Sequence, residues 1–220
     1  MMNKRVLLLC GHYGSGKTNI AVNVAKELKR EYPTVTLADL DIVNPYFRSK
    51  DSATELEEAG IRLICSNYAN SNVDIPALPP DLYALTDDRR MRAIIDVGGD
   101  DRGALVLGRL APALLAENDY EMIMVINCYR PLTRDAASTL EVMREIEYAG
   151  GIRFTALINN SNLGAETEAQ DVLDSMRYAE EVAAMSNLPL VMTTVEERLR
   201  EALKDKIPNL FALKLQNKIQ

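Results

Sequence analysis

The sequence feature that most constrains the fold is a glycine-rich segment near the N-terminus, Gly11-His-Tyr-Gly-Ser-Gly-Lys-Thr18. It matches the pattern G-x-x-x-x-G-K-[ST]. It directly follows an apolar run at residues 6–10 and opens a helix-period pattern over residues 18–29, which is the strand–loop–helix order that the motif requires. Glycines let the backbone approach an anion closely, and successive N–H groups at a helix N-terminus form a nest for phosphate. The segment therefore predicts a phosphate-binding loop.

The residue types in this loop predict a site for a nucleoside triphosphate with Mg²⁺. Lys17 is expected to reach the β- and γ-phosphates, and the Thr18 hydroxyl is expected to ligate Mg²⁺, a cation that prefers oxygen. The other binding candidates are the remaining loop residues and the next helix residue: Gly11, His12, Tyr13, Gly14, Ser15, Gly16 and Asn19. For His12, the only histidine of the chain, a phosphate or partner contact and a freely variable position are equal alternatives.

Short apolar runs alternate with helix-period segments along the whole chain. Strands are predicted at residues 6–10, 35–40, 62–66, 93–97, 122–127, 154–159 and 189–193. Most are apolar at nearly every position, which is typical of a parallel sheet buried on both faces. We therefore predict an α/β protein with a doubly wound, mostly parallel seven-stranded sheet flanked by helices. Residues 1–220 are expected to form a single domain, with a helical tail over about 196–220.

Aspartates follow two of the predicted strands, at the edge of the sheet where such folds bind ligands. Asp96 ends an apolar strand and is expected at the Mg²⁺ ion, with Asp39 as a second candidate on the metal side. Asp39, Asp41 and Asp100 are candidates for orienting the attacking water. Gly99 is expected to offer its N–H to the γ-phosphate.

Charge and cysteine content narrow the class of protein. The chain has 25 Lys and Arg against 32 Asp and Glu, a net charge of −7, and an acidic protein is a poor binder of nucleic acid through its net field. Its three cysteines are widely spaced and odd in number, which indicates a reducing compartment. No stretch approaches the 18 or more apolar residues of a membrane span. We therefore predict a cytoplasmic protein with no nucleic acid partner and no stable membrane association.

On these motifs, the chain resembles the MinD/ParA class of P-loop ATPases, which also includes the nitrogenase iron protein and dethiobiotin synthetase. The resemblance covers about residues 4–194 and implies ATP and Mg²⁺ as cofactors. It implies that Asp41 activates the water, and it likens residues 96–100 to the switch II of the iron protein. By the same match, Asn160 would contact the adenine, with Asn159 as the nearest competitor.

Three departures from this class bear on function. His12 stands where the MinD/ParA branch has a signature lysine that reaches the partner's phosphates, which weakens the expectation of an ATP-dependent homodimer. No cysteines surround residues 96–100 to hold an iron–sulfur cluster. Asn159-Asn-Ser-Asn162 replaces the guanine-reading N-K-x-D, which favours ATP over GTP. An arginine could stabilise the phosphate charge, and the candidates are Arg48, Arg102, Arg109, Arg130 and Arg134. The first two, Arg48 and Arg102, are the leading candidates.

The function predicted from the sequence is an ATPase that acts as a slow, Mg-ATP-dependent switch for an unidentified protein effector. The first alternative is a small-molecule kinase or ligase of the dethiobiotin-synthetase type, which would use the Asn- and Pro-rich loop at residues 67–80 for its substrate. A second alternative is a metal-centre maturation GTPase. A non-hydrolysing scaffold is the third.

Overall fold

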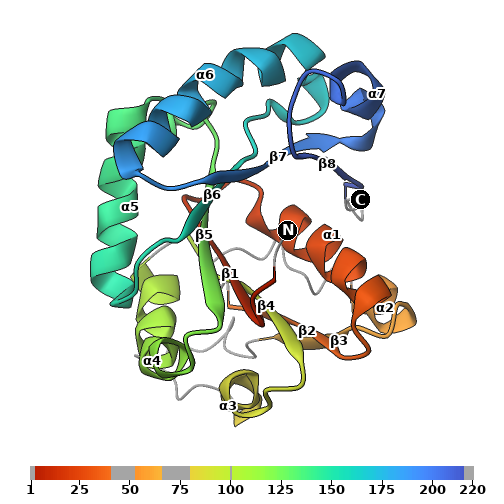
Figure 1. The fold of residues 1–220 in the computed structure, drawn as a ribbon, viewed down its shortest axis with the longest axis vertical. Coiled ribbons are helices and arrows are strands. Elements are labelled where there is room, and N and C mark those ends of the chain that lie inside the picture. Colours follow the sequence, from red (N-terminus) through yellow and green to blue (C-terminus); the bar gives the residue numbers. More distant parts are fainter. Residues whose placement is uncertain (1–2, 41–52, 66–79, 100, 216–220) are drawn as a thin grey trace.

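A computed structural model describes residues 3–40, 53–65, 80–99 and 101–215 of the chain. In these ranges all strands belong to one parallel sheet with the order β3-β2-β4-β1-β5-β6-β7-β8 (Figure 1). The strands are β1 (Val6–Cys10), β2 (Val35–Asp39), β3 (Arg62–Cys65), β4 (Arg92–Asp96), β5 (Tyr120–Ile126), β6 (Ala156–Asn159), β7 (Leu190–Glu196) and β8 (Leu210–Leu213). The prediction of a parallel α/β sheet is confirmed.

Helices cover both faces of this sheet. They are α1 (Lys17–Glu31), α2 (Ala53–Glu58), α3 (Pro80–Asp87), α4 (Asp101–Glu117), α5 (Ala136–Gly150), α6 (Ala169–Ser186) and the short α7 (Arg200–Leu203). Helices α1 and α2 pack with one face of the strands, and α3 to α6 pack with the other (Figure 1). The strands alternate between these two buried clusters, as period 2 requires: Leu7 and Leu9 face α1, whereas Leu8 faces the α4 side. The sheet is therefore doubly wound.

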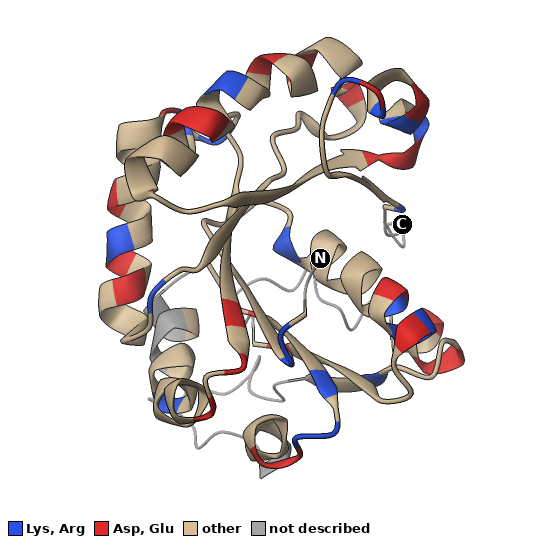
Figure 2. Cartoon of the chain, viewed as in Figure 1, with Lys and Arg blue, Asp and Glu red and all other residues tan. Residues whose placement is uncertain are grey.

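Local sequence explains where the long helices on the second face begin and end. Asp135 caps α5 by accepting the Ser138 N–H at 2.8 Å, and Gly151 ends the helix in the left-handed conformation. Asn187 ends α6 in the same conformation. Figure 2 shows acidic and basic positions interspersed along α5 and α6, while the central strands have few. These helices thus expose a mixed-charge surface and bury an apolar one.

The C-terminal tail differs from its prediction. Residues 210–213 form β8, parallel to β7, instead of continuing a helix. Pro208 has no N–H to donate to a helix, and Asn209 adopts a positive φ of 54°. The chain therefore turns back to the sheet edge, and the sheet has an eighth strand. The helical part of the predicted tail is short: the turn Glu197–Leu199 and α7.

The parallel arrangement places the carboxyl ends of all strands at one edge of the sheet. The loops that follow β1, β4, β5 and β6 meet there because these strands are neighbours or next neighbours in the order of the sheet. This is the edge at which sheets of this kind bind ligands. Among the described helices, none is both long and apolar enough to cross a membrane.

Candidate nucleotide-binding site

The glycine-rich loop joins β1 to α1 at the carboxyl edge, as predicted. Helix α1 begins at Lys17, directly after Gly16, which is in the left-handed region at φ 91°. At the start of the loop, Gly11 has a φ of 142°, and a Cβ there would lie 2.5 Å from the Val125 carbonyl oxygen of β5. A side chain at position 11 would therefore collide with the sheet backbone, which explains the first glycine of the motif.

The Lys17 ammonium is held inside its own loop. Its Nζ donates to the Gly11 carbonyl at 2.9 Å and to the His12 carbonyl at 3.3 Å, and the residue is buried. A buried ammonium needs such acceptors to offset its lost hydration. The Lys17 ammonium therefore lies within the loop at which the sequence predicts phosphate binding.

A hydroxyl and a carboxylate meet beside the loop, and a second carboxylate ends the neighbouring strand. The Thr18 hydroxyl lies 2.6 Å from Asp96 Oδ2, and Asp96 is fully buried at the end of β4. Asp39 ends β2 in direct register with Asp96, and it is also buried. Mg²⁺ prefers hard oxygen ligands of this type, usually one or two carboxylates together with water. The residues present thus fit Mg²⁺, with Thr18 and Asp96 as the groups that would hold it and Asp39 adjacent.

The loop after β4 packs directly on the phosphate loop. A Cβ built on Gly99 would lie 2.6 Å from the Tyr13 nitrogen and 2.9 Å from the Gly11 oxygen. Only glycine fits between the two backbones here. The contact places Gly99 beside the loop where its N–H was expected to act. Asp100, which follows it, and Asp41 lie outside the described residues.

Asn160 connects the loop to the far strands. Its Nδ2 donates to the Ser15 carbonyl at 2.6 Å, and its Oδ1 accepts from the Thr194 hydroxyl of β7 at 2.6 Å. The side chain is buried, and a Cβ on Gly16 would collide with it. Its role as the adenine contact stays a prediction. What the structure adds is an intramolecular role that the sequence had not suggested, namely support for the phosphate loop.

The remaining binding candidates lie around the same loop. Tyr13 is 56% exposed, whereas Ser15 is buried and Asn19 half-buried on α1. The His12 ring lies 2.9 Å from the Tyr13 carbonyl through Nδ1. These residues belong to the same loop and helix start as Lys17 and Thr18. Their contacts with a ligand stay predictions.

Of the arginine candidates, the structure brings Arg130 to the phosphate loop. Its Nε donates to the Gly14 carbonyl at 2.9 Å. Arg134 lies one turn further on, pairs with Asp135 at 3.5 Å and is largely exposed. Arg48 and the side chain of Arg102, the two leading candidates, lie outside what the structure describes. The sequence analysis included Arg130 among the candidates but could not single it out, because 116 positions separate it from Gly14.

Cys10 ends β1 next to this machinery but is suited to packing, not to chemistry. It is fully buried, and burial raises the pKa of its thiol to about 12, with Lys17 lowering and Asp96 raising that pKa to smaller extents. A thiol at this pKa stays protonated and unreactive at neutral pH.

Among the described residues, no cluster of three or more His, Cys, Asp or Glu could hold a metal.

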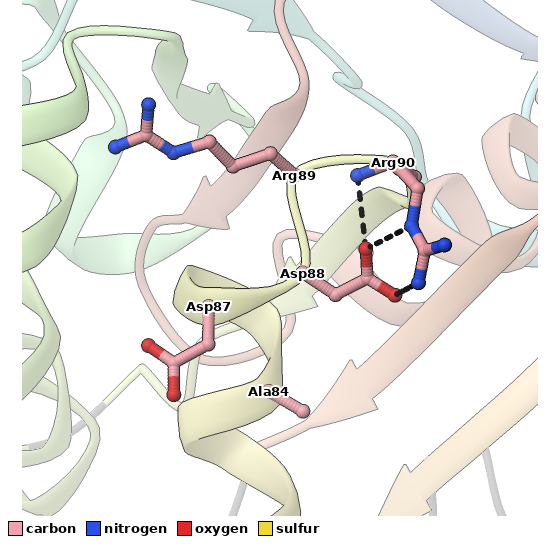
Figure 3. Close-up of a pocket in the computed structure, with 5 residues that line it drawn as sticks. All are labelled: Ala84, Asp87, Asp88, Arg89 and Arg90. Atoms are coloured by element: carbon pink, nitrogen blue, oxygen red, sulfur yellow. Dashed lines mark hydrogen bonds and ion pairs between the residues drawn. The ribbon is translucent and has the colours of Figure 1, made fainter.

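A surface hollow lies at the opposite edge of the sheet, before β4. It is lined by Ala84, Asp87, Asp88, Arg89 and Arg90. Figure 3 shows the Arg90 guanidinium closed onto Asp88, with Arg89 and Asp87 extending away from that pair. Since the hollow precedes β4 and the phosphate loop follows β1, the two lie at opposite ends of parallel strands. The hollow is not part of the nucleotide site.

Solved structures of other proteins share the fold of this chain. The cell division protein FtsY from Thermotoga maritima aligns with a TM-score of 0.58 at 17% identity, over 90% of this chain and 65% of that one. The signal recognition particle receptor FtsY from Elizabethkingia anophelis gives 0.54 at 16% identity, over 91% and 62%. The signal recognition particle 54 kDa protein from Aeropyrum pernix K1, in complex with GDP, gives 0.53 at 17% identity, over 87% and 41%.

This protein shares its fold with these FtsY and signal recognition particle proteins. At these identities the likeness concerns the fold alone, and the chain spans roughly two fifths to two thirds of the length of those proteins. No protein-family model matches the sequence, and no curated protein matches it. The fold class predicted from the sequence is confirmed.

Proposed function

We propose that this protein binds Mg-ATP at the phosphate loop and acts as a nucleotide-dependent switch for a protein partner, with slow hydrolysis. The observation that supports this most directly is the Thr18–Asp96 hydrogen bond of 2.6 Å, formed beside the buried Lys17 ammonium. These residues come from α1 and β4, and they match the metal and phosphate groups of the predicted site. A sheet built only for stability would gain little from burying an aspartate and a lysine together.

The chain's own residues supply binding and charge stabilisation. Lys17 would exchange its contacts with the Gly11 and His12 carbonyls for phosphate oxygens. Mg²⁺, when bound, would neutralise phosphate charge. Thr18 and Asp96 would hold that ion. Hydrolysis also needs a group that orients water, for which Asp41 and Asp100 remain the proposed residues.

The loop after β6 supports ATP over GTP. Guanine recognition in the N-K-x-D motif uses a carboxylate that accepts from the base, and this chain has Asn162 at that place. The Asn162 amide is used inside its own loop: Nδ2 donates to the Asn160 carbonyl at 2.7 Å, and Oδ1 accepts the Gly164 N–H at 3.1 Å. GTP is the second candidate, because a protein of similar fold was solved with GDP.

Direct binding tests nucleotide identity. Titration calorimetry with a non-hydrolysable ATP analogue and the matching GTP analogue, each with Mg²⁺, should give at least about tenfold tighter binding of the ATP analogue. Lys17→Ala should abolish binding of both, and Glu27→Ala on the exposed side of α1 is the matched control. Preference for the GTP analogue would reverse the proposed specificity, and the absence of binding to either would refute the proposed function.

The same edge supports a protein partner. Tyr13 in the phosphate loop, Leu132 after β5 and Leu163 after β6 are 56%, 53% and 44% exposed. Each of these large apolar side chains lies on a loop at the carboxyl edge of the sheet, where a partner that responds to the nucleotide would have to bind. We infer that the MinD/ParA-type resemblance extends to nucleotide-controlled association, either with an effector or with a second copy of the chain.

Light scattering after size exclusion tests this association, with Mg²⁺ and with or without the non-hydrolysable ATP analogue. A dimer that appears only with the analogue would support a ParA-like switch. An unchanged mass with the analogue bound would exclude the homodimer and favour an effector or the small-molecule kinase or ligase alternative. Steady-state hydrolysis that rises only with an added small molecule would favour the latter.

A further inference from the structure

The turn between β5 and α5 is a rigid support built on one buried asparagine. Asn127 is fully buried, and its Oδ1 accepts the Tyr129 N–H at 3.0 Å. Its backbone carbonyl accepts the Arg130 N–H at 3.2 Å and the Thr133 hydroxyl at 2.7 Å. Pro131 follows and further limits the backbone. The position of Arg130 is therefore set by the fold rather than by a flexible loop.

From this support, Arg130 reaches across to the phosphate loop. Its Nε donates to the Gly14 carbonyl at 2.9 Å, and a Cβ at Gly14 would lie only 3.3 Å from that same nitrogen. Gly14 has a φ of 75°, a backbone conformation that favours glycine. Among the residues that the structure describes, no carboxylate forms an ion pair with Arg130.

The contact fixes the orientation of one peptide group in the loop. In a trans peptide, the carbonyl and the following N–H point in opposite directions. Arg130 holds the Gly14 carbonyl on its own side, so the Ser15 N–H faces the other way. That N–H donates to the His12 carbonyl at 3.1 Å, next to the carbonyls of Gly11 and His12 that hold the Lys17 ammonium. The Gly14–Ser15 peptide is thus held from both ends, by Arg130 at its carbonyl and by the His12 carbonyl at its N–H, within the loop expected to bind phosphate.

We propose that Arg130 is a positioning residue for the phosphate nest, which it stabilises through the Gly14–Ser15 peptide while adding a positive charge at the loop. This inference rests on the proposed nucleotide site. Preorganised N–H donors bind an anion more tightly because the loop is not reordered on binding. The expected effect is on the affinity for phosphate groups and not on the affinity for the base.

The test compares Arg130→Ala with Arg134→Ala, which removes an arginine from the same turn that pairs with Asp135 and is 77% exposed in its side chain. Calorimetry uses Mg-ATP, Mg-GTP, pyrophosphate and adenosine as probes. Arg130→Ala should weaken pyrophosphate and the preferred nucleotide by about tenfold or more, as expected for a lost charge-assisted hydrogen bond. Adenosine affinity should not change, and Arg130→Lys should restore part of the phosphate affinity.

The outcomes separate this inference from the proposed function. If the wild type and Arg134→Ala bind nucleotide equally and Arg130→Ala binds it as well as they do, the role of Arg130 is refuted and the nucleotide site stands. Equal losses for adenosine and pyrophosphate in Arg130→Ala would indicate general damage to the fold and would also refute it. If the wild type binds neither nucleotide nor pyrophosphate, both proposals fail. Thermal unfolding of each variant without ligand is the second measurement, and it shows whether a substitution has damaged the fold.

Discussion

The Thr18 hydroxyl and the Asp96 carboxylate, 78 positions apart in the chain, lie 2.6 Å from each other at the carboxyl edge of the sheet. β4 lies directly beside β1, from which the phosphate loop leads into α1. Because β1 and β4 are adjacent and parallel, the end of the glycine-rich motif, at Thr18, lies beside the end of β4, at Asp96. This pair is the Mg²⁺ site that we propose.

The first prediction concerns this pair. Asp96→Asn and Thr18→Val should each weaken the Mg²⁺-dependent part of nucleotide binding by about 10- to 100-fold, because each removes an oxygen group that holds or orients the ion. The measurement is analogue affinity with Mg²⁺ and with EDTA. The difference between the two conditions should shrink in both variants. A full Mg²⁺ dependence in Asp96→Asn would show that the ion is held elsewhere.

The second prediction concerns the loop support by Asn160. Asn160→Ala leaves the Ser15 carbonyl and the Thr194 hydroxyl without their partner in a buried region, and should lower the free energy of unfolding by about 1–3 kcal/mol. Asn162→Ala, whose bonds stay within its own loop, is the control and should cost less. Urea unfolding measures both. A double-mutant cycle with Thr194→Val should show coupling, and simple additivity would contradict the bond.

The third prediction concerns an ion pair at the opposite edge. The guanidinium of Arg5 is buried and makes two bonds to Glu117, with Nε and Nη2 each 2.5 Å from a carboxylate oxygen. Glu117→Ala would strand a buried charge and should cost about 3–5 kcal/mol in unfolding free energy. Glu27→Ala removes an exposed partner of Arg30 and should change stability little. Equal effects of the two variants in chemical denaturation would disprove the importance of burial.

The fourth prediction concerns pH and Cys10. Burial raises the pKa of this thiol from 9.0 to about 12 in the folded protein. Below pH 9 the thiol is protonated in both states, and above it the unfolded chain ionises first. Its contribution to stability is therefore present below pH 9 and is lost as the pH rises toward 12. Between pH 8 and 11, wild type should lose more stability than Cys10→Ala in urea titrations, and parallel curves would contradict the shift.

Thiol labelling provides an independent check of the same residue. In a Cys65→Ser, Cys128→Ser background, Cys10 is the single thiol of the chain. A thiol reagent at pH 8 should leave it unmodified in the folded protein and modify it completely in denaturant. Rapid labelling without denaturant would show that β1 opens readily at its carboxyl end.

The loop from Gly11 to Thr18 was predictable because its conformation depends on local residues. Glycines at positive φ and the helix start at Lys17 are encoded within eight positions. Asp96 was also predictable, since a buried apolar strand that ends in an acid is a local pattern. The proposed roles of Asp41 and Asp100 remain predictions, because both residues lie outside the described part of the chain.

The strand at residues 210–213 shows where local patterns fail. Its apolar spacing is irregular, and a free sheet edge at β7 is what selects the extended conformation. Asn160 and Arg130 were missed as supports of the phosphate loop for a related reason. Each contacts the loop across more than 110 positions.

The sequence alone thus determined the glycine-rich loop between the first strand and its helix, and the parallel α/β class, since these follow from residue type and periodicity over short stretches. Tertiary structure alone decided which distant side chains hold that loop in place. The order of strands in the sheet puts the turn after β5 beside Gly14 and the loop after β6 beside Ser15. Strand order is a property of the packed whole, because it depends on which neighbours bury the most apolar surface together.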